Sequence, residues 1–174
     1  MAKARAIPGI HEDDPYAQVA AAVVATRADE LVEHSAGVLE IAEIERVHAM
    51  RVATRRLRAS LEVFDPCFPR KPYKRTLREV KALADALGER RDRDVAIAAL
   101  TAFSTAVTEA DRPGVDGLIT ILREEQAWAN RELEPWVSPE RLAELAARID
   151  QLVIAARALA AGAGRNGDRP QEPG

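Results

Sequence analysis

The chain has 174 residues, a formal net charge of −3 at pH 7, 47% hydrophobic residues and only 4% aromatic residues. This length suffices for one domain with a buried core, and the abundance of Ala and Leu favours packed helices over a sheet. The single cysteine, Cys67, excludes an internal disulfide, and no apolar run reaches the ~20 residues that a membrane span needs.

Six helices are predicted, because six segments with helical apolar periodicity are separated by proline, glycine or capping residues. In chain order they cover residues 15–37, 43–64, 73–87, 92–109, 115–134 and 139–161. Asp14-Pro15 and Ser138-Pro139 are typical helix starts, in which a capping side chain precedes proline at the first helical position. Gly88 is predicted to end the third helix, and Asp92 to cap the start of the fourth.

The connections between these helices are short, which implies an all-α antiparallel bundle over residues 14–162. Residues 1–13 show neither periodicity nor the apolar segment of a secretory signal, so we expect a flexible arm on a cytoplasmic protein. Residues 163–174 are rich in glycine and proline and are expected to form a disordered tail.

Positive charge is concentrated in one part of the chain. Between Arg46 and Arg91 there are 13 Lys/Arg and 5 Asp/Glu, a net charge of +8, while the rest of the chain carries a net charge of −11. Such asymmetry indicates a local anion-binding surface on an otherwise acidic protein.

The second helix, with the sequence VHAMRVATRRLRASLEVF at residues 47–64, separates core and charge at about 100° per residue. One face should pack into the core, and it consists of Val47, Met50, Thr54, Leu57, Leu61 and Phe64. A second, cationic stripe consists of His48, Arg51, Arg55 and Arg58, whereas Arg56 points elsewhere.

The third helix repeats this design, with an apolar face of Leu77, Val80, Ala84 and Leu87. Lys74, Arg78 and Lys81 form its cationic stripe. If the second and third helices pack antiparallel, the two stripes flank one basic groove.

Like charges four residues apart oppose helix formation by a few tenths of a kcal/mol per pair. One explanation for stripes of like charge despite this cost is a solvated face whose cations pair with acidic residues on other helices. The other is a polyanionic ligand, since guanidinium groups bind phosphate oxygens through two hydrogen bonds. His48 could donate a hydrogen bond to such a ligand, and it lacks the neighbouring His or Cys that a metal site needs.

These residues carry a family resemblance. The segment VHAMRVATRRLRASLEVF, followed by ALGERRDRDV, resembles the CHAD domain, the conserved histidine α-helical domain. The resemblance implies a helical bundle whose histidine and basic residues bind inorganic polyphosphate. The second motif matches at Leu87, Gly88, Arg91, Asp92, Asp94 and Val95, which adds Arg91 as a ligand candidate. Since no second His-and-Arg helix follows, the resemblance implies a short form that covers the N-terminal half of the family's domain.

The sequence therefore predicts non-catalytic binding of polyphosphate through a basic groove on the second and third helices. The predicted ligand-binding residues are His48, Arg51, Arg55, Arg56, Arg58, Lys74, Arg78, Lys81 and Arg91. No catalytic residue, metal site or cofactor is predicted. A full CHAD domain resembles two four-helix halves related by a pseudo-two-fold axis, so the resemblance implies a homodimer that rebuilds both halves. It also implies a triphosphate-processing partner enzyme and association with polyphosphate granules.

Three other hypotheses stay open at this stage. An enzyme that acts on polyphosphate is disfavoured, because the sequence has no glycine-rich phosphate loop. Binding of a nucleic-acid backbone is less expected, because no aromatic residue is interleaved with the basic stripes for base stacking. A helical scaffold or accessory module of a triphosphate-processing enzyme is the remaining alternative.

Overall fold

A computed structural model describes residues 4–166 of the chain. In this part of the chain there are five α-helices and one short 3-10 helix, and no strand. The helices are α1 (Tyr16–Glu33), α2 (Ile44–Val63), α3 (Arg70–Ser104), α4 (Arg112–Val137) and α5 (Pro139–Asn166), with the 3-10 helix η1 (Asp65–Cys67) between α2 and α3. The predicted all-α fold is confirmed, but the described residues form five helices rather than six.

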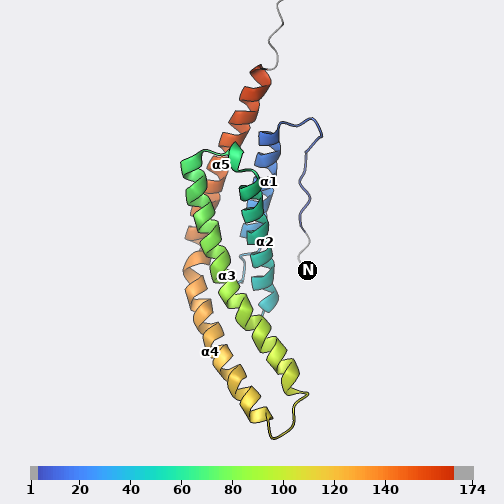
Figure 1. Cartoon of the computed structure of the whole chain (residues 1–174). Coiled ribbons are helices and arrows are strands. Elements are labelled where there is room, and N and C mark those ends of the chain that lie inside the picture. Colours follow the sequence, from blue (N-terminus) through green and yellow to red (C-terminus); the bar gives the residue numbers. More distant parts are fainter. Residues whose placement is uncertain (1–3, 167–174) are drawn as a thin grey trace, which may run out of the picture.

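The helices form a four-rod bundle in which α1, α2 and α3 alternate in direction and α4 and α5 together make the fourth rod (Figure 1). Around the bundle α1 packs on α2 and α5, and α3 packs on α2 and α4. Ser138 separates α4 from α5 with an extended backbone. Its Oγ accepts the backbone N–H of Arg141 at 3.2 Å, as expected for a capping residue before Pro139.

The two segments predicted as the third and fourth helices form a single helix, α3. Gly88 and Asp92, predicted to cap its two halves, both lie inside this 35-residue helix. Buried side chains continue past the expected break, from Leu87 to Arg90 and Asp94. A glycine inside a helix costs only about 1 kcal/mol relative to alanine, so packing on both sides outweighs the local stop signal.

We expect that Gly88→Ala raises the free energy of unfolding by about 0.5–1 kcal/mol. A Cβ atom at this position would lie 3.9 Å from Nε of Arg51, which is an ordinary contact. Chemical denaturation followed by circular dichroism would measure the gain. Gly117→Ala is the matched control, because a Cβ there meets no atom within 4 Å. A loss of stability confined to Gly88→Ala would show that the added methyl group displaces Arg51.

The predicted core face of α2 is confirmed in full. All six of its residues are buried: Val47, Met50, Thr54, Leu57, Leu61 and Phe64. The core face of α3 is only partly as predicted, because Val80 and Leu87 are buried whereas Leu77 and Ala84 are half-buried. Leu83 is buried in their place, so the buried face of α3 is shifted around the helix relative to the prediction.

The described part of the N-terminal arm is held against α1. The backbone N–H of Arg5 donates to Oε1 of Glu30 at 2.5 Å, and Nη1 of Arg27 donates to Oε2 at 2.7 Å. Burial alone would raise the pKa of Glu30, but these donors outweigh it and hold the pKa below its ordinary value. Residues 1–3 of the predicted arm lie outside the described residues.

The predicted tail of residues 163–174 overlaps the end of α5, which continues to Asn166. Residues 167–174 lie outside the described residues.

The helix α1 ends at Glu33, before the predicted end at Gly37, which adopts a positive φ of 67° in the following turn. Glycine favours this conformation, since it lacks a Cβ.

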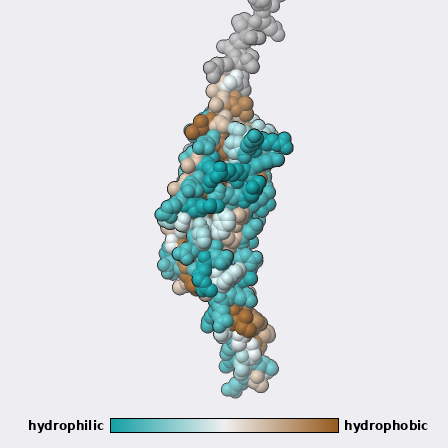
Figure 2. Space-filling view, turned by 90° about the vertical axis from the view of Figure 1, so that its left-hand side faces the viewer, coloured by the Kyte–Doolittle hydropathy of each residue, from teal (hydrophilic) through white to brown (hydrophobic). Residues whose placement is uncertain are grey.

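Part of α3 and α4 projects beyond α1 and α2 as a two-helix hairpin (Figure 1). We define the projecting hairpin as residues 95–128. The last buried residue of α3 is Asp94, and the buried residues of α4 before Ala129 are Ile119 and Gln126. Large apolar side chains of the hairpin are exposed: Val95, Phe103, Leu118, Ile121 and Trp128. Figure 2 shows a hydrophobic patch near this end, below a largely hydrophilic bundle surface.

Candidate functional site

The predicted basic stripes lie on α2 and α3, two antiparallel helices that pack on each other, and Lys81 and Arg91 of α3 contact α2 directly. We call this line of cationic side chains the basic seam, and it comprises His48, Arg51, Arg55 and Arg58 from α2 with Lys74, Lys81 and Arg91 from α3. These residues lie beside the buried face of each helix and not within it, so their charges remain accessible to a ligand.

Glu62 joins the two helices within the seam. Its Oε1 accepts from Nε of Arg58 at 3.2 Å and lies 3.0 Å from Nζ of Lys81. The hydrogen bond from Lys81, together with Arg58, holds the pKa of Glu62 below its ordinary value. One carboxylate between two cations leaves an excess positive charge at this point.

Arg51 and Arg91 occupy the other half of the seam. Arg51 is half-buried beside Gly88, and its Nε is buried without a hydrogen-bond partner among the described residues. Nη1 of Arg91 donates to the carbonyl oxygen of Ile44 at 3.1 Å, and Nη2 lies 3.6 Å from Oε1 of Glu45. Arg91 therefore ties α3 to the start of α2, whereas Arg51 keeps an unused donor.

His48, Arg55 and Lys74 complete the seam without native counter-charges. Within residues 4–166 no carboxylate lies within ion-pair distance of these three side chains. Arg55 is exposed and borders a shallow hollow of about 260 Å³ on the outer surface of α2. A polyanion could therefore contact Arg55 and Lys74 without first breaking an ion pair.

Two predicted site residues lie away from the seam. Arg56 faces α1, where its Nη1 lies 3.9 Å from Oε1 of the buried Glu30. Arg78 lies on the opposite flank of α3, in a hollow that also contains Trp136 and Arg141. The structure thus places Arg51, Arg58, Lys81 and Arg91 at the contact between α2 and α3, whereas Arg56 extends toward α1 and Arg78 toward α5.

A buried polar cluster, which the sequence analysis did not predict, links α3 to α4. The Arg90 guanidinium, with no exposed surface, pairs with the carboxylate of Asp94. Nε of Arg90 donates to Oδ1 of Asn130 at 3.2 Å, and Nε2 of Gln126 donates to Oδ1 of Asp94 at 2.6 Å. Burial lowers the pKa of Arg90, and the neighbouring Arg91 adds to this effect. The four-residue spacing of Arg90 and Asp94 was the available sequence signal.

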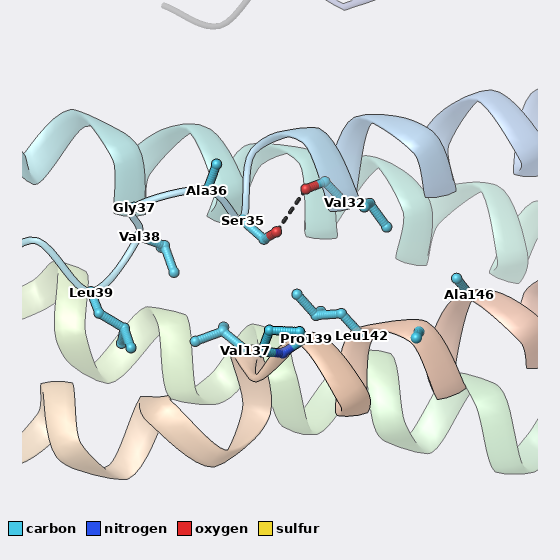
Figure 3. Close-up of a pocket in the computed structure, with 11 residues that line it drawn as sticks. Val32, Ser35, Ala36, Gly37, Val38, Leu39, Val137, Pro139, Leu142 and Ala146 are labelled. Atoms are coloured by element: carbon cyan, nitrogen blue, oxygen red, sulfur yellow. Dashed lines mark hydrogen bonds between the residues drawn. The ribbon is translucent and has the colours of Figure 1, made fainter.

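An apolar cavity of about 520 Å³ lies between the turn after α1 and the junction of α4 with α5 (Figure 3). Val32, Val38, Val137 and Leu142 are among its lining residues, and none of its lining residues is ionisable. Oγ of Ser35 donates to the carbonyl oxygen of Val32 at 2.7 Å, as Figure 3 shows. This cavity offers no cation to an anionic ligand, so the basic seam is the better candidate site.

The described residues contain no group of three or more His, Cys, Asp or Glu side chains able to hold a metal ion. None of the helices in this part of the chain combines the length and apolar character needed to cross a membrane. The guanidinium, ammonium and imidazole groups of the seam are suited to electrostatic binding of anions.

Comparison with known families gives one match. Residues 22–172 match the family model described as CHAD domain. The match covers nearly the whole chain, including α4 and α5, and not only the N-terminal half that carries the basic motifs. No curated protein and no solved structure gives a significant match.

Proposed function

Because this chain belongs to the CHAD domain family, which is associated with polyphosphate and triphosphate binding, we propose that it binds inorganic polyphosphate through the basic seam. The observation that carries this proposal is the excess of cations where α2 packs on α3. Arg58 and Lys81 share the single carboxylate of Glu62, and Arg55 and Lys74 have no acidic partner among the described residues. A chain of phosphates supplies the missing negative charge.

The mechanism is multivalent charge pairing. Each guanidinium of the seam can donate two hydrogen bonds to one phosphate, and the lysines add less directional attraction. His48 lies one helical turn before Arg51 and donates a further hydrogen bond.

We propose that this binding is not catalytic. Hydrolysis of phosphate chains generally needs carboxylates that hold Mg²⁺ between the attacking and leaving oxygens. In the seam Glu62 already contacts two cations, which disfavours a role as a metal ligand. Phosphate release by the purified protein would contradict this part of the proposal.

The test is a titration with long-chain polyphosphate at about 50 mM and about 200 mM salt. By analogy with single-stranded nucleic acids, log K should fall by about 0.7 per phosphate contact for each unit of log salt. Orthophosphate should bind weakly, because a single phosphate makes only one of the contacts that a chain makes together. Recognition of polyphosphate by the seam would be contradicted if tight binding did not weaken with increasing salt. It would also be contradicted if duplex DNA bound with the same affinity as polyphosphate.

We expect that Glu62→Gln strengthens polyphosphate binding several-fold, because the change releases Arg58 and Lys81 from their native carboxylate. Asp85→Asn is the matched control, since this exposed carboxylate on α3 makes no ion pair within residues 4–166. Unchanged affinity in Glu62→Gln would show that these two cations do not contact the ligand.

The same variant should alter the dependence of stability on pH. The lowered pKa of Glu62 means that its carboxylate stabilises the native state above its unfolded-state pKa. This contribution is lost as the pH falls through the folded-state pKa. The stability difference between wild type and Glu62→Gln should therefore be present at neutral pH and vanish in acid.

A further inference from the structure

A second cationic surface lies on the opposite flank of α3 from the basic seam, facing α5. Two adjoining hollows of about 320 and 280 Å³ follow the line between these helices, and Arg75 and Arg148 line both. We call them together the α3–α5 trough. Five cationic side chains line it, namely Lys71, Arg75, Arg78, Arg141 and Arg148, against only the carboxylates of Glu79 and Glu144.

The two arginines of α5 are fixed in position within the trough. Nε of Arg141 lies 2.7 Å from Oε1 of Glu79, and its guanidinium carbon lies 5.0 Å from the ring centre of Trp136. Nη2 of Arg148 lies 2.8 Å from Oε2 of Glu79, while its Nε is buried without a hydrogen-bond partner in the described part of the chain. One carboxylate thus orients two guanidinium groups and leaves donors unused.

The trough and the seam are joined across the exposed surface of α3. Arg78 lines the trough, and Lys81 of the seam follows it by three residues. Lys71, Arg75 and Arg78 follow one another at spacings of four and three residues, which place side chains next to each other on a helix. Among residues 4–166 no carboxylate lies within ion-pair distance of Lys71, Arg75 or Arg78. The row of cations is therefore continuous from one flank of α3 to the other.

We infer that the α3–α5 trough is a second phosphate-binding site, which takes the continuation of a polyphosphate chain that starts in the basic seam and crosses α3. This inference rests on the proposed function and extends it to α5. Crossing a helix spans about 10 Å. A short chain should therefore occupy only one of the two surfaces, whereas a long chain bridges both. The anchored guanidinium groups of Arg141 and Arg148 make the trough a pre-organised end point for the chain.

The experiment measures the acetylation rates of Lys71 in the trough and Lys81 in the seam by mass spectrometry of the full-length protein. Long-chain polyphosphate should protect both lysines, whereas tripolyphosphate should protect Lys81 and leave Lys71 reactive. The variant Arg75→Gln/Arg78→Gln should lose protection of Lys71 but keep that of Lys81. Its dissociation constant for long chains should rise about 30-fold, because two exposed charge-assisted contacts are removed.

The matched control is Arg123→Gln/Arg131→Gln, which removes the same charge from exposed positions on α4. Protection of Lys81 alone by long chains would overturn the inference while the proposed function stands. Equal protection of both lysines by tripolyphosphate would also overturn it, since the surfaces would then act independently. If polyglutamate protected Lys71 as well as long-chain polyphosphate does, the trough would be a site for acidic peptides instead. Protection of neither lysine, with no binding, would overturn the proposed function as well.

Discussion

Asp94→Ala should lower the free energy of unfolding by about 3–5 kcal/mol, which is the usual effect of removing one partner of a buried ion pair. The change leaves the guanidinium of Arg90 fully buried without a counter-charge and takes the acceptor from Nε2 of Gln126. For a chain of this size the melting temperature should fall by at least about 6 °C. Urea denaturation followed by circular dichroism would measure the loss.

Asp92→Ala provides the matched control, because Asp92 is an exposed carboxylate two residues away on the same helix. It should change stability by no more than about 0.5 kcal/mol. The double variant Arg90→Leu/Asp94→Leu should recover part of the loss, since it removes both buried charges but leaves Gln126 and Asn130 without these partners. If Asp94→Ala unfolds at the same urea concentration as the wild type, the ion pair between Arg90 and Asp94 does not stabilise the fold in solution.

The combined variant Arg51→Gln/Arg55→Gln/Arg58→Gln should raise the dissociation constant for long-chain polyphosphate about 100-fold. Each guanidinium–phosphate contact at the protein surface contributes about 1 kcal/mol, and three such losses make about 3 kcal/mol. The salt dependence should weaken too, with the slope of log K against log salt falling in magnitude by about 2. Fluorescence anisotropy with a labelled chain would measure both quantities.

Arg123→Gln/Arg131→Gln/Arg157→Gln removes the same charge from exposed positions on α4 and α5, away from the seam. This control should change affinity by less than about threefold, through the overall charge alone. Circular dichroism must show native helix content in both variants, because Arg51 is half-buried. Equal losses of affinity in both variants would mean that polyphosphate binding depends on the net charge of the protein and not on the seam.

The core face of α2 was predictable because its pattern is unambiguous. Apolar residues alternate at spacings of three and four from Val47 to Phe64, which only a helix can bring to one side. The charges beside them then follow from geometry. This is why the sequence alone places Arg51, Arg55 and Arg58 on one stripe.

The course of α3 was not predictable from local signals. Gly88 and Asp92 are favourable at helix ends, and together they look like a stop followed by a start. The deciding contacts are tertiary, because the buried Arg90 and Asp94 bind Gln126 and Asn130 of α4 across the predicted break. Residues 32 or more positions away in the chain therefore set the helix length.

The same reasoning explains why the site was predicted only in part. A helical wheel places Arg56 and Arg78 relative to their own helices but does not show which neighbour covers each flank. Glu30 on α1 lies beside Arg56, and the α5 arginines lie beside Arg78. Both contacts depend on how the rods of the bundle are arranged, which the sequence pattern alone did not define.

The projecting hairpin has a consequence for local motion. Within the bundle each rod is packed on two others, whereas beyond Asp94 the described residues of α3 have only α4 beside them. Separating the tip of α3 from α4 exposes little further apolar surface, so this end should open without global unfolding. Amide hydrogens near Phe103 should therefore exchange with solvent much faster than those near Leu57, which the surrounding rods protect.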